Sequence, residues 1–243
     1  MKRLLTVVLI LTLSLGVLSP SAGLALTRSD RQKFPYTAVA YIKCQFNCGC
    51  TRYESGTMVA RNGMVTAGSA MLCPSHNKKV SDMEFWFGWI SPSDFFYHYN
   101  GSCSYRCYAD FSNGYDSEND IGYIVFPENV GETTGWFASL FTDNASEFKT
   151  AQRCKMVGYD GDWDLNYKWV NASRYSDVEI RSPKGNDAYA SGTPLCFTYT
   201  DYGETVHEIR AIYTAKSDSY YYARILTNNI YDEMIDDGVL FSH

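Results

Sequence analysis

The stretch SGTMVARNGMVTAGSA, residues 55–70, contains two short apolar runs of strand length. GTMVA (56–60) and MVTAG (64–68) are separated by residues that include Asn62 and Gly63, both of which favour turns. The stretch therefore predicts a β-hairpin.

Similar runs of apolar and β-branched residues recur along the whole chain, with Gly, Asn, Asp and Ser between them. About a dozen short strands of this kind predict an all-β protein, packed as a barrel or a sandwich. The further runs are YTAVAYI (36–42), MEFWFGWI (83–90), IGYIVF (121–126), KMVGY (155–159), DVEI (177–180), TPLCFTYT (193–200), VHEIRAIY (206–213) and YYYARIL (220–226).

The C-terminal part has a different period. Leu226, Ile230, Met234 and Ile235 follow a helical spacing, Thr227 or Asn228 can cap the start, and DDG (236–238) can end it. We expect one helix there. The polar stretch PENVGETTGW (127–136) is predicted to join two halves of the chain.

The N-terminus has the pattern of an export signal. Lys2 and Arg3 precede an apolar run from Leu4 to Leu18, and small residues surround Gly23 and Ala25. That run is shorter than the roughly 20 residues needed to span a bilayer, and no later segment is long and apolar enough. We predict a signal peptide over residues 1–25 and a secreted, extracellular protein with no membrane partner.

The charge balance argues against nucleic acid as a partner. Cleavage after residue 25 removes two basic residues, so 19 basic and 27 acidic residues remain, a net charge of about −8. About 218 residues then remain, enough for one sizeable core or two small ones.

All eight cysteines lie in the exported part, and an even number in an oxidising compartment predicts up to four disulfides. A metal site is the alternative, because Cys44-x3-Cys48-x-Cys50 and Cys73-x2-His76 supply soft ligands at short spacing. Export favours disulfides, so we expect no metal and no cofactor.

Two polar residues lie where strands begin. In YASGTPLCF (189–197), Ser191 precedes a strand at a tight turn, where its hydroxyl can be exposed and backbone N–H groups can face a developing oxyanion; an ordinary turn is the alternative. In ENDIGYIVF (118–126), Asp120 lies at the start of an apolar strand. With the hairpin end at residue 69, the order is base position, acid and serine, so two of the three roles of the Ser-His-Asp mechanism are filled.

Taken in order, these segments resemble the chymotrypsin-fold (trypsin-like) serine peptidases, and among them most closely the bacterial glutamyl endopeptidases. The resemblance runs from about Tyr36 to Ile235. Besides the hairpin, the aspartate strand and the serine turn, it rests on VGETTGWF (130–137), VGYDGD (157–162) with Trp169, and AIYT (211–214) with ARILTNNIYDEMI (223–235).

The resemblance implies two packed six-stranded antiparallel β-barrels, residues 26–135 and 136–243, with a cleft between them and a C-terminal helix. Ser191 would be the nucleophile and Asp120 the orienting acid. It also implies a second-barrel disulfide between Cys154 and Cys196 and a bridge from Cys73 to Cys50 or Cys48. We further predict a local bridge between Cys103 and Cys107, with Cys44 as the remaining candidate.

Three departures from the family pattern bear on function. Ser69 stands at the position of the histidine, and its hydroxyl cannot exchange a proton near neutral pH as imidazole does, which typically costs about a million-fold in turnover. Tyr189, followed by Ala190, replaces the glycine whose N–H forms the oxyanion hole with that of Ser191, at a cost of about 3–4 kcal/mol if the donor is misaligned. Tyr213 replaces the histidine that recognises glutamate.

The leading hypothesis is therefore a monomeric pseudo-peptidase that binds a peptide or protein in the cleft, or a protein on the aromatic segment MEFWFGWISPSDFFYHY (83–99). The alternative is an active serine endopeptidase in which a non-standard base, such as His76 or a group of the substrate, takes the proton of Ser191. We interpret His98, His207 and His243 as loop, strand or terminal residues. A structural envelope component with no function in the cleft is the third hypothesis.

Overall fold

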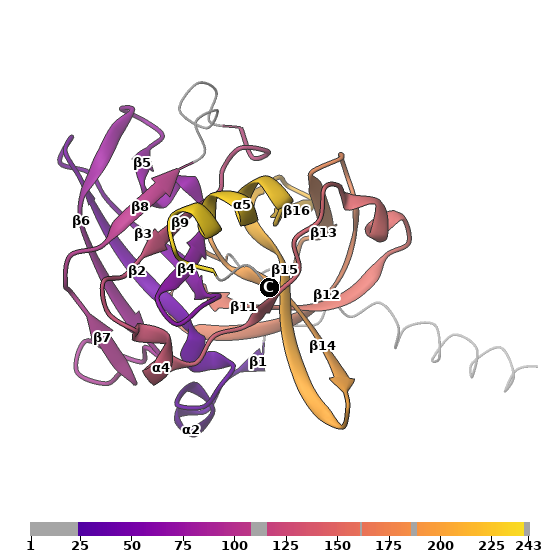
Figure 1. Ribbon diagram of the computed structural model, residues 1–243, viewed down its shortest axis with the longest axis horizontal. Helices are drawn as coiled ribbons and strands as arrows, with labels where there is room; N and C mark the ends of the chain where they lie inside the picture. Colours follow the sequence, from indigo (N-terminus) through magenta and orange to yellow (C-terminus); the bar gives the residue numbers. More distant parts are fainter. Residues whose placement is uncertain (1–23, 108–115, 161, 186–188, 241–243) are drawn as a thin grey trace, which may run out of the picture.

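The computed structural model describes residues 24–107, 116–160, 162–185 and 189–240. The chain forms two largely antiparallel, curled β-sheets that lie side by side (Figure 1). This confirms the predicted all-β, two-barrel architecture. Among the described residues no helix has the length and apolar character needed to cross a membrane.

The first sheet contains the strands of the N-terminal half in the order β5-β6-β2-β3-β4-β9-β8, and β7 pairs with β6. Its strands are β2 (Val39–Phe46), β3 (Thr51–Met58), β4 (Gly63–Thr66), β5 (Leu72–Cys73), β6 (Lys78–Phe87), β7 (Tyr97–Tyr99), β8 (Ser104–Cys107) and β9 (Gly122–Val125). The predicted hairpin of residues 55–70 is the β3–β4 pair, in which Thr57 is opposite Val65. Six strands run consecutively from β6 to β8, and β5 and β7 extend the sheet at β6.

The second sheet closes on itself. β13 pairs with both β16 and β12, so β12-β11-β14-β15-β16-β13 form a ring of six strands, as predicted for this barrel. Its strands are β11 (Gln152–Tyr159), β12 (Leu165–Arg174), β13 (Glu179–Pro183), β14 (Pro194–Asp201), β15 (Glu204–Lys216) and β16 (Tyr220–Ile225), with β1 (Leu24–Ala25) beside β12 and β10 (Ala138–Ser139) beside β15.

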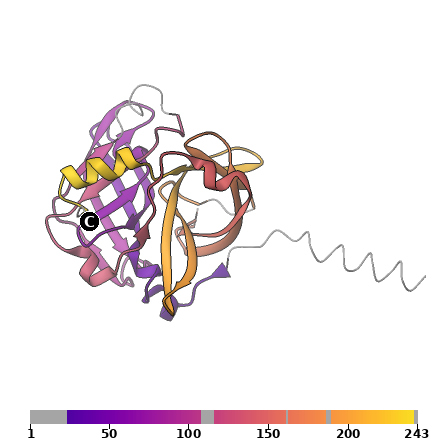
Figure 2. The same ribbon diagram turned by 45° about the vertical axis from the view of Figure 1, so that its right-hand side comes forward.

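The C-terminal helix α5 (Asn228–Asp236) follows the second barrel but packs on the first (Figure 2). Ile230 and Met234 are buried in the same apolar cluster as the N-terminal strands. The Tyr123 hydroxyl of β9 also donates to Oδ2 of Asp237, at 2.8 Å. The helix predicted over 226–235 is confirmed, with Thr227 as its N-cap residue and Gly238 in the left-handed region (φ +72°) just after its end.

The segment predicted as a linker contains the short helix α4 (Val130–Thr134). The Gly131 N–H donates to the Arg61 carbonyl at 2.7 Å, and a Cβ on Gly131 would lie 2.8 Å from the Ala60 carbonyl oxygen. The connection is therefore packed against the β3–β4 turn. The remaining short helices are α2 (Arg28–Arg31), η1 (Tyr36–Ala38), η2 (Gly68–Ala70) and η3 (Ala145–Lys149).

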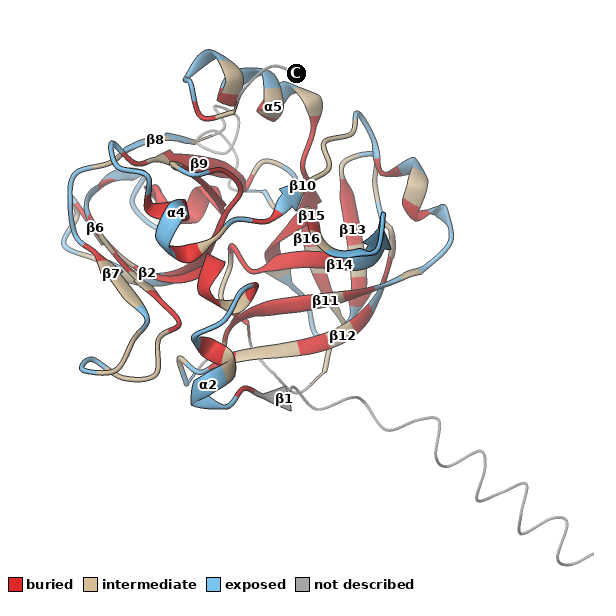
Figure 3. Ribbon diagram, turned by 60° about the horizontal axis from the view of Figure 1, so that its bottom comes forward, coloured by how far each residue is buried: buried red, intermediate tan, exposed pale blue. Residues whose placement is uncertain are grey.

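Buried residues lie along the strands of both sheets (Figure 3). An aromatic contact group connects the barrels: the Tyr41 ring of β2 stacks on Trp89 at 5.3 Å and meets Trp163 edge-on at 5.1 Å. The Tyr159 hydroxyl of β11 accepts a hydrogen bond from the Trp89 N–H at 3.1 Å. The two barrels are thus joined by apolar rings as well as by hydrogen bonds.

Candidate active site

Ser191 lies in the turn before β14, and this turn docks on the first barrel. The Ser55 N–H of β3 donates to the Ser191 carbonyl at 2.7 Å. Gly192 has a φ of +87°, and a Cβ there would clash with the Ser55 carbonyl oxygen, so the turn needs glycine. The Ser-Gly sequence therefore sets the position of Ser191 between the barrels.

The Ser191 side chain is half-buried, and its hydroxyl donates to the carbonyl oxygen of Thr214 at 3.3 Å. A peptide carbonyl accepts a hydrogen bond but is too weak a base to remove a serine proton near neutral pH. Within the described part of the chain, no hydrogen bond joins the Ser191 hydroxyl to Asp120 or Ser69.

Ser69 and Asp120 are brought together, as the sequence predicts. Ser69 lies in η2, and its backbone N–H donates to Asp120 Oδ1 at 2.7 Å while its hydroxyl lies 3.4 Å from Oδ2. Both side chains are buried. Burial raises the pKa of Asp120 to about 7, and the hydrogen bond from the Ser69 backbone partly opposes that rise.

A second buried carboxyl, Glu54, was missed from the sequence. It lies on β3, is 1% exposed, and accepts a hydrogen bond from Arg52 Nε at 3.0 Å. Burial raises the pKa of Glu54 to about 8; Arg52 and a hydrogen bond from the Ser69 side chain oppose the rise, and the charge of Asp120 adds to it. Ser69 is therefore in contact with two carboxyl groups. Its position in the sequence gave no signal, because its role depends on its burial beside Ser69.

The Tyr189 position is filled by a buried ring. The Tyr189 side chain, 4% exposed, lies in the core of the second barrel with its ring 6.3 Å from that of Tyr221. The Tyr213 ring meets Tyr221 edge-on at 5.4 Å, and burial raises the pKa of Tyr213. The three tyrosines pack together beside the serine turn. Residues 186–188, just before Tyr189, lie outside the described residues.

The histidines have other partners. His76 Nδ1 lies 3.4 Å from Cys50 Sγ, the His98 ring stacks on Trp86 at 4.8 Å, and His207 Nδ1 lies 3.1 Å from Thr198 Oγ1. None of these three contacts Ser191 in the part of the chain that the structure describes. His243 lies outside it. The geometry therefore gives no contact through which His76 would act as a base.

All eight cysteines are free thiols in the structure, so the predicted disulfides stay predictions. Cys196 is directly opposite Lys155, so the neighbouring Cys154 points to the other face of the sheet, and the two thiols lie in different apolar clusters. Cys103 directly precedes the extended strand β8 and Cys107 is its last residue, so their Cα atoms lie about 13 Å apart at 3.3 Å per residue, compared with a limit of roughly 7 Å for a disulfide.

The structure brings the candidate partners of the third predicted pairing close together. The Sγ atoms of Cys48, Cys50 and Cys73 lie within 4.8 Å of one another and of a His76 ring nitrogen. Cys44 is separate from this group and is fully buried in β2.

The aromatic segment 83–99 does not present its rings as one free surface. Trp86 lies between Tyr41 and His98, and Trp89 stacks on Tyr41. On the same side of the molecule, the Tyr53 ring of β3 is 38% exposed and meets Trp163 at 4.7 Å. Tyr53 lies two residues before Ser55, which holds the Ser191 turn.

Comparison with known proteins shows the fold. No protein-family model matches the chain, and no curated protein is significantly similar in sequence. Among solved structures, a Glu endopeptidase in complex with MPD is similar at 17% identity and a TM-score of 0.68, over 89% of this chain and 95% of the other. The protease Anisep from Arthrobacter nicotinovorans is similar at 12% identity and a TM-score of 0.68, over 85% of this chain and 97% of the other. The thermostable serine protease AL20 from an extremophilic microorganism is similar at 14% identity and a TM-score of 0.67, over 85% of this chain and 99% of the other. The chain thus has the two-barrel fold of the chymotrypsin-like serine proteases.

Proposed function

We propose that this chain is a secreted, trypsin-like serine peptidase homologue that binds a peptide or protein segment between its barrels without hydrolysing it. The observation that supports this most directly is the pair of contacts at the two serines. Ser69 stands at the position of the base and bonds to Asp120, and the Ser191 hydroxyl donates to the Thr214 carbonyl. We further propose that it acts as a monomer, and its acidic balance disfavours nucleic acid as the ligand.

The chemical argument concerns the proton of Ser191. Hydrolysis requires a group within hydrogen-bond reach that removes this proton and later returns one to the leaving group. The Thr214 carbonyl is too weak a base to take this proton. The Ser69 hydroxyl is no more basic than the Ser191 hydroxyl that it would have to deprotonate. Asp120 and Glu54 have raised pKa values but make no hydrogen bond to Ser191 among the described residues. Among the described residues at this site, none replaces the imidazole.

The surface beside Ser191 suits binding. The half-exposed ring of Tyr53 and the Trp163 ring against it lie on the strand and loop next to the serine turn. Aromatic rings with one exposed face contribute strongly to peptide binding because they bury a large apolar area at little entropic cost. An extended peptide with an apolar or aromatic side chain is the ligand that this surface favours.

The test compares the wild-type chain with Ser191→Ala on mixed peptide and ester substrates and on an immobilised peptide library. We expect the same background turnover from both chains and the same bound peptides, with binding weakened in Tyr53→Ala. Turnover that disappears in Ser191→Ala would contradict the proposal. A chain that binds no peptide would fit a structural envelope role instead.

A further inference from the structure

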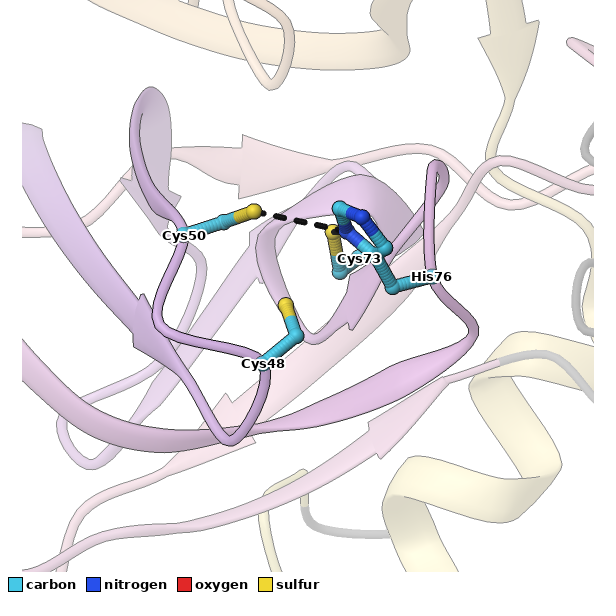
Figure 4. Close-up of side chains that lie close together, drawn as sticks. All are labelled: Cys48, Cys50, Cys73 and His76. Carbon is cyan, nitrogen blue, oxygen red and sulfur yellow. Dashed lines mark hydrogen bonds between the residues drawn. The ribbon is translucent and has the colours of Figure 1, made fainter.

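Three thiols and one imidazole lie close together in the first barrel. Cys48 and Cys50 lie in the β2–β3 turn, Cys73 ends β5, and His76 lies in the turn that follows (Figure 4). Their ligand atoms all lie within 4.8 Å of one another. We propose that Cys48, Cys50, Cys73 and His76 form a structural zinc site.

The spacing of the ligand atoms agrees with tetrahedral coordination. With Zn–S near 2.3 Å and Zn–N near 2.0 Å, the edge from a sulfur to a nitrogen in a tetrahedron is about 3.5 Å. His76 Nδ1 lies 3.4 Å from Cys50 Sγ and 3.6 Å from Cys73 Sγ. A set of three cysteines and one histidine is a common closed structural zinc site, and it leaves no open position for a substrate.

The backbone holds the ligands in two tight turns. In the first, the Phe46 N–H donates to the Cys50 carbonyl at 2.9 Å, and Gly49 adopts a φ of +83°. In the second, the Cys73 carbonyl accepts from the N–H groups of His76 at 3.3 Å and Asn77 at 2.8 Å. Both turns are closed by main-chain bonds, which leaves the side chains available as ligands.

A direct contact joins the first turn to the start of β6 (Lys78–Phe87), the strand that follows the second turn. The backbone N–H and the side-chain amide of Asn47 both bond to the Lys79 carbonyl, at 3.1 and 3.2 Å. The ligand set is therefore arranged by the fold itself, as a metal site with good affinity requires.

A disulfide fits this group less well than a metal. A bond between any two of the three thiols leaves the third beside an imidazole with no covalent partner, whereas zinc uses all four side chains. On binding, the thiols lose their protons to solvent, and three thiolates with a neutral imidazole coordinate the dication. Cys73 is 2% exposed and His76 is exposed, so the ion would enter from the His76 side.

The site would stabilise the two segments that deliver buried groups to the candidate active site. Cys50 precedes Glu54 by four residues on β3, and Cys73 follows Ser69 by four residues. A bound zinc would therefore link these segments in the place where the sequence predicts a bridge from Cys73.

The test measures metal content in the protein expressed from its full sequence, by elemental mass spectrometry and by replacement with Co²⁺. We expect about one zinc per chain, and a Co²⁺ form with the visible absorption of a tetrahedral thiolate site. His76→Ala should weaken zinc binding by more than the 10- to 100-fold typical of losing an outer-shell partner. His76→Cys should bind about one zinc per chain, because cysteine can replace the histidine ligand. Cys103→Ser, which removes a thiol outside the group, should leave the zinc content unchanged. His76 is exposed, so its variants are expected to fold.

Two outcomes would overturn the proposal. One is a chain that, with its thiols reduced, takes up neither Zn²⁺ nor Co²⁺. The other is peptide mapping of the unreduced protein that finds a disulfide between two of Cys48, Cys50 and Cys73. Neither outcome bears on hydrolysis at Ser191, so this inference fails or holds independently of the proposed function.

Discussion

The Oδ2 atom of Asp120 faces the Ser69 hydroxyl at 3.4 Å, while Oδ1 accepts the Ser69 backbone N–H at 2.7 Å. Asp120 and Ser69 are thus in direct contact through both the backbone and the side chain of Ser69. Because both groups are buried, this contact affects stability as well as chemistry.

The pH dependence of stability should report the two buried carboxyls. The folded-state pKa values of Asp120 and Glu54 are raised to about 7 and about 8, above their ordinary values near 4. Between the ordinary and the raised pKa values, the two carboxyl groups are protonated in the folded chain but ionised in the unfolded chain. They therefore lower the free energy of unfolding as the pH rises from about 4 to about 8. Asp120→Asn should remove part of this decline, because an amide still accepts the Ser69 N–H and does not ionise.

Thermal and denaturant unfolding at pH 5 and pH 8 measures this effect. Between pH 5 and pH 8, we expect the free energy of unfolding of the wild type to fall by about 1–3 kcal/mol more than that of Asp120→Asn. It should also fall more than that of Glu54→Gln. Equal pH profiles for the wild type and both variants would show that neither carboxyl has a raised pKa.

Gly192 should tolerate no side chain. Gly192→Ala places a Cβ against the Ser55 carbonyl at a φ of +87°, so we expect a loss of at least about 2 kcal/mol of unfolding free energy in a denaturant titration. Gly203→Ala is the matched control, because its φ is +86° but nothing lies within 4 Å of the added Cβ. It should lose only about 1 kcal/mol. Equal losses in both variants would mean that the serine turn does not dock on β3 as described.

The hydrogen bond between the barrels at Tyr159 should be measurable in the same way. Tyr159→Phe leaves the partly buried Trp89 N–H without its acceptor, so we expect a loss of about 1–2 kcal/mol. Tyr202→Phe, at a fully exposed tyrosine in the β14–β15 turn, should be neutral. A neutral Tyr159→Phe would argue that Trp89 finds another acceptor.

Restoring the base should restore reactivity in part. In Ser69→His an imidazole is introduced next to Asp120 Oδ2, which can orient it, so we expect Ser191 to become slowly reactive toward a fluorophosphonate. The Tyr189 position should keep the rate about 10²–10³-fold below that of a site with a complete oxyanion hole. The double variant Ser69→His, Ser191→Ala is the control for labelling elsewhere, and labelling that persists there would disprove the assignment to Ser191.

The sequence predicted the elements whose patterns are local. The helix over 226–235 has clear periodicity and capping residues, and the hairpin of residues 55–70 has turn residues between two apolar runs. Strand β12 (Leu165–Arg174) was missed because its residues, LNYKWVNASR, are largely polar, although it pairs with β11, β13 and β1. Its stability comes from neighbours that local patterns do not reveal.

Pairing between distant residues depends on strand register, which local sequence patterns do not reveal. Cys154 and Cys196 lie on adjacent strands, but a displacement of one residue puts them on opposite faces. Glu54 was missed because its role comes from burial beside Ser69, which sequence spacing does not encode. Asp120 and Ser69 were placed together correctly because they were inferred from the order of whole segments.

The most direct test of the central claim is labelling of the wild-type chain with a serine-directed fluorophosphonate at neutral pH, read by intact mass and peptide mapping. The account predicts an unmodified Ser191 after an exposure that fully labels an active serine protease. A phosphonyl adduct on Ser191 would contradict it, because it would show that some group at this site removes the serine proton.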